Sequence, residues 1–382
     1  MIHDVWNDRN IELYRKTTVT LPTIEERIKE IEEEIKKTKY NKATESHIGI
    51  LKAKMAKLQM EAESHKHSGG GSGFSVPKSG DATVAFVGYP NVGKSSLLNV
   101  VTGTESEVGN FAFTTLRVVP GTLKYKGAQI QILDLPGIIE NAATGSGRGR
   151  EVLSMVRAAN MIILVTDNQC KGMDRIIEEL RKAGIVVNRR RKNISMKKTS
   201  TGGIKVRKPK TVEMDDERIR EMARQFKITN AEIYIREVVN DDDLIDFFRG
   251  NVVYLPAVVA VNKMDMPHDE RLVKSMNAYG KVIKMSAATK TGIDELKESI
   301  YESLDLIRVY MRDRAGNTDF ERPLVLKDGA TVKEVCRKIS REMMDSFRYA
   351  MLTSHSSKIN EMRVGMDYPL SDEDIVTIIS RN

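Results

Sequence analysis

The sequence predicts an α/β protein whose main domain is a largely parallel sheet with helices on both faces. Apolar runs of strand length recur at 129–133, 161–165, 257–261 and 281–285, and helical segments separate most of them. A glycine-rich loop joins an earlier strand of the same domain to a helix. Composition agrees with a globular chain, because 40% of the residues are apolar and 30% are charged.

The bulk numbers limit the class of protein further. A chain of 382 residues with a net charge of +8 has room for two or three domains. Its two cysteines, Cys170 and Cys336, stand far apart, so neither a disulfide framework nor a zinc site is indicated. The N-terminus lacks the apolar core of a signal peptide, and the apolar runs are too short to span a bilayer. We therefore expect a cytoplasmic protein.

Residues 1–64 are predicted to form an N-terminal helical hairpin, followed by a Gly-rich linker at 65–80. Thr23 and Glu26 have the spacing of a capping box, which marks a helix start. The Lys- and Glu-rich outer face is either a functional surface or simply a solvated one. Two apolar stripes at helical spacing then need each other as partners: Ile24, Ile28, Ile31 and Ile35, and Ile48, Leu51, Met55 and Leu58.

The main domain is predicted in two parts, 81–169 and 251–307, because about eighty residues separate two of its successive strands. The intervening 170–250 is predicted to be an inserted basic α/β subdomain. It has helices near 173–183, near 215–226 and after Asp241, and strands near 185–188 and at 231–235. The final part, 308–382, is predicted as a small sheet crossed by one helix that starts near Thr331.

The segment 188–210 inside the insertion is the one dense basic cluster of the sequence. Almost half of its residues are Lys or Arg, and none is acidic. Such a run repels itself unless a polyanion is near, so we favour contact with the phosphate backbone of RNA over a merely solvated loop.

The glycine-rich loop has the pattern GxxxxGKS between a strand and a helix, which predicts a phosphate-binding loop. Its backbone amides and the helix N-terminus favour phosphate, and Lys94 should reach the β- and γ-phosphates. The Ser95 hydroxyl should bind Mg²⁺. The predicted nucleotide-binding residues of this loop are Gly88, Asn91, Val92, Gly93, Lys94, Ser95 and Ser96.

Two further motifs complete the predicted phosphate end of the site. Asp134 and Gly137, in a DxxG pattern at a strand end, should hold Mg²⁺ through water and sense the γ-phosphate. Between the motifs lies a threonine pair in the position of a mobile loop, with Thr115 the preferred Mg²⁺ ligand and Thr114 the alternative. We expect Lys94, Thr115 and Gly137 to act in catalysis.

The base is predicted to be guanine. Asn262, Lys263 and Asp265 follow a buried strand as NKMD, and a carboxylate at Asp265 can accept from both N1–H and the exocyclic amine of guanine. Adenine offers no such pair. Ser286, Ala287 and Ala288 follow the next strand and fit a loop whose backbone amide contacts the guanine carbonyl.

One residue predicts slow turnover. Ile138 stands where Ras-like enzymes carry a glutamine that orients the attacking water, and an apolar side chain cannot do this. Asn91 could instead ligate a potassium ion that bridges the phosphates. The following glycines, Gly145, Gly147 and Gly149, are either a loose loop or, as we prefer, a second switch segment.

Taken together, these motifs resemble the Obg-related GTPases, and specifically the developmentally regulated GTP-binding (DRG) family. The resemblance covers nearly the whole chain, from NKATESHIGILKAKMAKL through SGGGSGF, FAFTTL, DLPGIIENAATGSGRGREV and NKMD to the C-terminal region. It implies a P-loop GTPase domain, a helix-turn-helix-like hairpin, an insertion similar to part of a ribosomal protein and a C-terminal β-grasp (TGS-like) domain.

The resemblance also implies potassium-stimulated hydrolysis of GTP to GDP, association with ribosomes in translation and a dedicated regulatory protein partner. A GTPase switch on the ribosome or on structured RNA is therefore the function we expect. An RNA-binding scaffold that holds nucleotide only to fold, and a GTPase switch for a non-ribosomal partner, are the alternatives.

Overall fold

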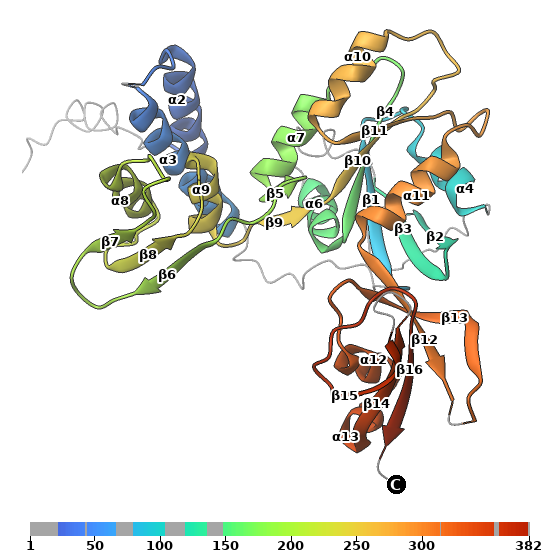
Figure 1. Cartoon of the computed structure of the whole chain (residues 1–382). Coiled ribbons are helices and arrows are strands. Elements are labelled where there is room, and N and C mark those ends of the chain that lie inside the picture. Colours follow the sequence, from blue (N-terminus) through green and yellow to red (C-terminus); the bar gives the residue numbers. More distant parts are fainter. Residues whose placement is uncertain are drawn as a thin grey trace, which may run out of the picture. The chain divides into compact units, whose positions relative to one another are not determined.

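The computed structural model shows two compact units, each with its own core (Figure 1). The small unit comprises 1–71 and 191–252, and the large unit comprises 72–190 and 253–382. No helix in the described part of the chain is both long and apolar enough to cross a membrane. The structure describes residues 22–42, 44–65, 79–103, 119–135, 148–313, 315–354 and 359–380.

The large unit is built on a six-stranded sheet of order β11-β10-β4-β1-β3-β2. All neighbours are parallel except β2, which runs antiparallel to β3 at the edge. The predicted α/β class with a mainly parallel sheet is thus confirmed, whereas the edge strand β2 was not predicted. The strands are β1 (Ala82–Gly88), β2 (Val119–Tyr125), β3 (Ala128–Asp134), β4 (Met161–Thr166), β10 (Ala257–Val261) and β11 (Lys281–Lys284).

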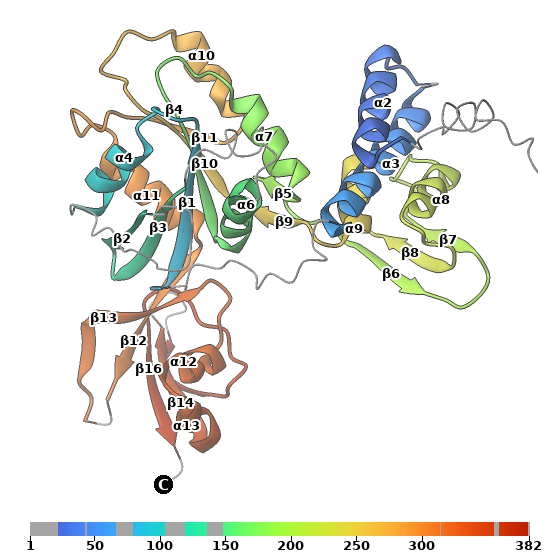
Figure 2. The ribbon, with the colours of Figure 1, turned by 180° about the vertical axis from the view of Figure 1, so that it is seen from behind.

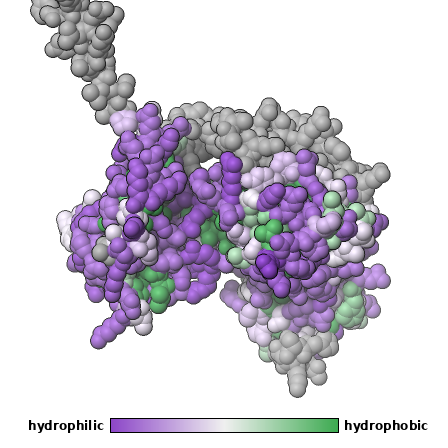
Figure 3. Space-filling view, turned by 90° about the horizontal axis from the view of Figure 1, so that it is seen from above, coloured by the Kyte–Doolittle hydropathy of each residue, from purple (hydrophilic) through white to green (hydrophobic). Residues whose placement is uncertain are grey.

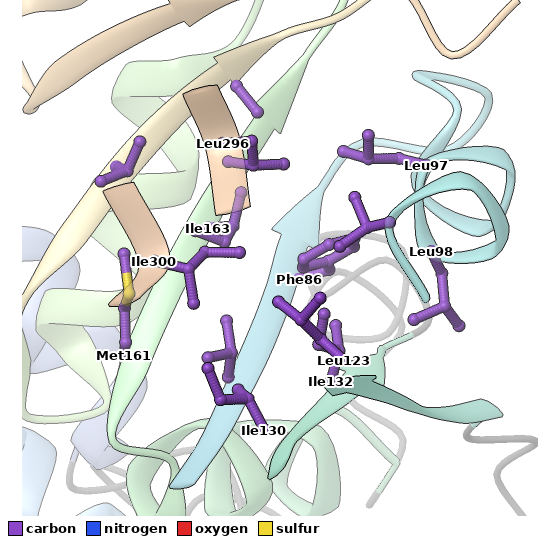
Figure 4. Close-up of a cluster of buried hydrophobic side chains, with 14 of the residues drawn as sticks. Phe86, Leu97, Leu98, Leu123, Ile130, Ile132, Met161, Ile163, Leu296 and Ile300 are labelled. Carbon is purple, nitrogen blue, oxygen red and sulfur yellow. The ribbon is translucent and has the colours of Figure 1, made fainter. Parts of the chain in front are cut away.

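Helices cover both faces of this sheet, because alternate residues of each central strand point to opposite sides. Phe86 of β1 packs with Leu97, Leu98 and Leu296 from α4 (Lys94–Thr102) and α11 (Ile293–Ser303), as Figure 4 shows. Ala85 and Val87 belong to the other core layer. Its helices are α6 (Arg148–Ala158), α7 (Met173–Lys182) and α10 (Glu270–Ser275), which a 3₁₀ turn, η1 (Met276–Ala278), follows.

The insertion starts later in the chain than the predicted boundary at 170. The helix predicted near 173–183 is α7, and its Met173, Ile176 and Leu180 are buried in the core of the large unit. The strand after it, β5 (Ile185–Val187), pairs in parallel with β9 (Val253–Leu255) of the same unit. The small unit therefore takes only 191–252 from the insertion, because the apolar side of α7 needs the large sheet as its partner.

The small unit combines the hairpin helices with the rest of the insertion. Its three-stranded sheet has the order β6-β8-β7, and α2 begins at the predicted capping box of Thr23 and Glu26. In Figure 3 hydrophilic residues predominate on the visible face of the hairpin. The elements are α2 (Ile24–Lys37), α3 (Glu45–His65), β6 (Ile194–Lys198), β7 (Ile204–Arg207), α8 (Asp216–Gln225), β8 (Ala231–Ile235) and α9 (Asp241–Arg249).

The hairpin is not a separate domain, which differs from the predicted boundary at residue 64. Leu51 and Leu58 of α3 pack on α2, as the apolar stripes predicted. A second side of the same helix carries Ala53 and Ala56 into the core formed by α8, α9 and the sheet. Small residues let helices approach closely without adding an apolar stripe, so this contact has little signal in the sequence.

The C-terminal part of the large unit is a five-stranded sheet of order β13-β12-β16-β14-β15. Its main helix, α12 (Val332–Ile339), starts after Thr331 with a capping box to Glu334, and α13 (Arg341–Ser346) follows. The predicted small sheet with a crossing helix is confirmed. The strands are β12 (Leu306–Arg312), β13 (Thr318–Lys327), β14 (Phe347–Ser354), β15 (Ile359–Val364) and β16 (Asp374–Ser380).

Candidate nucleotide-binding site

The loop between β1 and α4 has the backbone of a phosphate-binding loop. Gly93 has a φ of 92°, a left-handed conformation that favours glycine, and Asn91 also has a positive φ, of 61°. A Cβ on Gly93 would lie 2.4 Å from the Asn262 side-chain nitrogen, so only glycine fits. The loop leads directly into the N-terminus of α4, where backbone amides favour an anion.

Lys94 is buried at the start of α4, and its ammonium lies inside the curve of the loop. Its Nζ donates to the carbonyl oxygens of Gly88 and Tyr89, both at 3.0 Å. These contacts hold the charge at the mouth of the loop, where it can meet a phosphate. Ser96, also predicted to bind nucleotide, lies exposed in the first turn of α4.

Ser95 and Asp134 meet at the carboxyl edge of the sheet. The hydroxyl of Ser95 donates to Asp134 Oδ2 at 2.5 Å, and Asp134 ends the strand that pairs with β1. Burial raises the pKa of the Asp134 carboxyl, whereas the Ser95 hydrogen bond and the Lys94 charge oppose the rise. A hydroxyl and a carboxylate side by side are oxygen ligands of the kind that Mg²⁺ prefers, so the pair fits the predicted ion.

Asn262 connects three loops of the site. Its Nδ2 donates to the Val92 carbonyl at 2.9 Å, and its Oδ1 accepts from the Ala287 amide at 3.0 Å. Its own backbone N–H donates to the Thr166 carbonyl at the end of β4. The side chain is only 2% exposed, so it fixes the predicted base loops against the phosphate loop.

Lys263 and Asp265, which are predicted to recognise the base, lie in the loop after β10. Lys263 Nζ donates to the Asn91 carbonyl at 2.6 Å and lies 3.8 Å from Asp167 Oδ2, which stretches its stem along the loop. Asp265 is exposed and makes no hydrogen bond within the described residues, so its carboxylate is available to a ligand.

The loop of Ser286, Ala287 and Ala288 is ordered by its own hydrogen bonds. The buried Ser286 hydroxyl accepts from the Thr289 amide at 3.1 Å, and Ser286 bridges to Thr291. Ala287 is half-buried and Ala288 is exposed, beside the loop that carries Asp265.

Several predicted site residues lie outside the described residues: Thr114, Thr115, Gly137 and Ile138, with Gly145 and Gly147 of the expected switch segment. Gly149 lies in the first turn of α6.

Two neighbours of the site were missed by the sequence analysis. Asp167 contacts Lys263, and the ring of Tyr89 lies against Gly172, where a Cβ would come within 2.3 Å of it. Asp167 directly follows the β4 strand, as Asn262 follows β10, and that shared position was the available signal.

A parallel sheet with a phosphate loop after its first strand and an NKxD loop after another defines a P-loop GTP-binding protein. Models of three families match successive parts of the chain: "50S ribosome-binding GTPase" at 83–198, "C-terminal region of MMR_HSR1 domain" at 201–306 and "TGS domain" at 307–380. The C-terminal sheet is thus a TGS domain.

Whole-chain relatives identify the family. An uncharacterised GTP-binding protein of Methanocaldococcus jannaschii is 46% identical, covering 93% of each chain. Developmentally-regulated G-protein 3 of Arabidopsis thaliana is 42% identical (94% of this chain, 100% of that protein), and human developmentally-regulated GTP-binding protein 2 is 40% identical (93% and 99%). The chain belongs to the developmentally regulated GTP-binding protein family.

Among solved structures, a GTP-binding protein of Pyrococcus horikoshii matches with 18% identity and a TM-score of 0.42, over 78% of this chain and all of that one.

Proposed function

We propose that this protein is a slow GTP-hydrolysing switch of the Obg-related type that works in the cytoplasm on ribosomes or structured RNA. The carrying observation is the convergence of Lys94, the Ser95–Asp134 pair and Asn262 with its loops at one edge of the sheet. A protein that held nucleotide only as a structural ligand would not need both a γ-phosphate lysine and a complete ion-binding pair.

The residues divide the work between phosphate and base. Lys94 binds the β- and γ-phosphate oxygens and stabilises the charge that they carry as water replaces the GDP oxygen on the γ-phosphorus. Asp265 selects guanine, and Asn262 keeps the two ends of the nucleotide in register. Ser95, Asp134 and Thr115 would hold Mg²⁺, whose positive charge offsets that of the phosphates.

Potassium is part of this proposal. The Asn91 side chain is exposed at the tip of the phosphate loop and makes no hydrogen bond to the described residues. An amide oxygen there suits a monovalent cation that bridges the phosphates and supplies positive charge where an arginine finger would otherwise sit, in a site that has Ile138 in place of the water-orienting glutamine. Hydrolysis should therefore be faster in KCl than in NaCl, and Asn91→Ala should abolish the difference; equal wild-type rates in the two salts would contradict it.

Ribosome or RNA association is supported by the basic segment 188–210 and by the description of the family model that matches 83–198. A dedicated regulatory protein partner is a further expectation from the family.

The test is GTP turnover by the full chain in potassium buffer, with and without ribosomes, with Lys94→Ala as the inactive control. Stimulation above the basal rate supports the ribosomal switch. Slow turnover that ribosomes leave unchanged would contradict ribosomal activation and favour another protein partner. Tight nucleotide binding with no turnover above the control would favour the RNA-binding scaffold.

A further inference from the structure

The three-stranded sheet of the small unit has one covered face and one open face. Along β8, Ala231, Ile233 and Ile235 are buried, whereas Glu232 and Tyr234 between them are half-exposed. The helices α3, α8 and α9 all lie on the buried side (Figures 1 and 2). The residues between the buried ones therefore form an outer sheet face.

Strand register brings basic residues from two strands together on that face. Glu232 pairs with Lys197 of β6 on one side and with Lys205 of β7 on the other. Two residues further along β8, Tyr234 pairs with Arg207 of β7. The outer sheet face is thus defined by Lys197, Lys205, Arg207, Glu232, Tyr234 and Arg236.

The charge of this face is strongly unbalanced. Lys197 and Lys205 are exposed and make no hydrogen bond or ion pair within the described residues. The Tyr234 hydrogen bond and the charges of Arg207, Lys205 and Lys197 hold the pKa of the Glu232 carboxyl below its usual value. Even when ionised, one carboxylate cannot neutralise the four cations around it. An exposed excess of this kind attracts a phosphate backbone.

Other basic residues of the 188–210 segment have structural roles instead. Lys192 Nζ donates to the Val238 carbonyl at 3.0 Å. Lys208 Nζ donates to the Val212 and Met214 carbonyls and lies 3.2 Å from Asp216. Their charges are engaged inside the small unit, so these two residues contribute little to an external phosphate site.

Tyr234 adds an aromatic ring at the centre of this charge. Its hydroxyl donates to Glu232 at 2.6 Å, which orients the side chain along the strand, and the Arg236 guanidinium lies 5.8 Å from the ring centre. An aromatic ring among cations on an open sheet is the arrangement on which unpaired bases stack. Bases inside a duplex are already stacked on one another and do not offer a free face.

We propose that the outer sheet face binds single-stranded RNA, with Lys197, Lys205 and Arg207 on phosphates and Tyr234 stacked on a base. This inference rests on the proposed RNA association and assigns it to a face of six residues, three of which, Glu232, Tyr234 and Arg236, lie outside the basic segment found in the sequence.

The test uses the full chain and a fluorescently labelled oligouridylate, with the dissociation constant measured by anisotropy over a series of salt concentrations. For K197Q/K205Q/R207Q, the slope of log affinity against log salt should become shallower by about 2, because each single-strand phosphate contact contributes about 0.7. The matched control is R191Q/K198Q/K210Q, which removes the same charge from exposed residues of the same segment. Its slope should stay at the wild-type value.

Two single variants test the rest of the face. Glu232→Gln should tighten binding, and a gain of this kind cannot come from misfolding. Tyr234→Leu should weaken binding about tenfold, whereas Tyr234→Phe, which keeps the ring, should retain it. Equal binding of a duplex with no effect of Tyr234→Leu would overturn the single-strand assignment.

The outcomes separate this inference from the proposed function. If both triple variants lose affinity equally, the outer sheet face is wrong although RNA association stands. If the wild-type chain binds neither oligouridylate nor ribosomes, the proposed RNA association is wrong, and so is the proposal that the outer sheet face binds RNA.

Discussion

At the scale of single residues, one side chain holds the loops of the candidate site together without needing to touch the substrate's reacting atoms. Asn262 joins the phosphate loop to the base loops through both ends of its amide. The pattern NKMD predicted its presence at the site, but the two partners, Val92 and Ala287, are 170 and 25 residues away in sequence. Only the fold could show that one amide serves both.

Asn262→Ala should weaken both stability and nucleotide binding. The Val92 carbonyl and the Ala287 amide would lose their partner, and leaving such groups unpaired costs about 1–3 kcal/mol each. We expect the unfolding free energy of the large unit to fall by about 2 kcal/mol or more, measured by urea titration. Asn262→Asp keeps the acceptor for the Ala287 amide, so its unfolding free energy should lie between those of the wild type and Asn262→Ala. An unchanged titration for Asn262→Ala would contradict the bridging role.

Asp265→Asn should change the base that the site prefers. The carboxylate can accept two guanine hydrogens, and the loss of a charged partner costs roughly 2 kcal/mol, or about thirtyfold in GTP affinity. Xanthine carries an oxygen in place of the guanine amine, so the new amide can donate to it and XTP should bind better than GTP. Competition against a fluorescent GTP analogue measures the affinities for GTP and for XTP. Because Asp265 is exposed, the urea midpoint of unfolding should not change in this variant. A preserved preference for GTP over XTP would contradict the role of Asp265 in selecting guanine.

At the scale of helices and strands, strands with a clear apolar pattern were predictable, whereas those inside the basic segment were not. The strands at 161–165, 231–235 and 257–261 are continuous or alternating apolar runs, and the structure has β4, β8 and β10 there. The strands β6 and β7 lie within the basic segment, where Lys and Arg on the open side hide the alternation of Ile194 and Met196, and of Ile204 and Val206. Like β8, they bury only the face that the helices cover.

Ala53→Leu should loosen the small unit. Ala53 is 0% exposed where α3 packs on the core shared with α8, and extra methylenes in such a contact cost about 1–3 kcal/mol. Hydrogen exchange of β8 peptides in the full chain should accelerate. The exposed neighbour Lys54→Leu serves as the control and should leave exchange unchanged. Unaltered exchange in Ala53→Leu would show that the hairpin does not support the insertion.

At the scale of the whole molecule, the chain forms two compact units, and the candidate nucleotide site belongs to one of them. The hairpin and 191–252 form one unit and meet in the core that Ala53 and Ala56 enter, whereas the large sheet and the TGS domain form the other unit. A chain that leaves the large unit at 190 and returns at 253 couples the two covalently at both ends of the insertion.

GTP should stabilise the large unit selectively. A ligand that binds only the folded site adds about 2.7 kcal/mol at one hundred times its dissociation constant. Hydrogen exchange of β1 and β10 peptides should slow on addition of GTP and Mg²⁺, while that of β8 peptides should not change. Lys94→Ala provides the control without phosphate contacts. Equal slowing in β8 would mean that the units unfold together.

By itself, the sequence determined the class of fold and indicated a guanine nucleotide, and it predicted that the candidate site residues lie together. It could do so because parallel strands end at one edge of the sheet, so the residues that follow each strand must converge wherever the strands pair. The tertiary structure alone decided that α7 belongs to the large unit, that α3 buries a second side through Ala53 and Ala56, and that Lys197 and Lys205 flank Tyr234's strand. The apolar side of α7 shows that this helix needs a partner but not which sheet supplies it. The other contacts join segments far apart in the chain through small or charged residues, which carry no periodic apolar signal for a sequence to reveal.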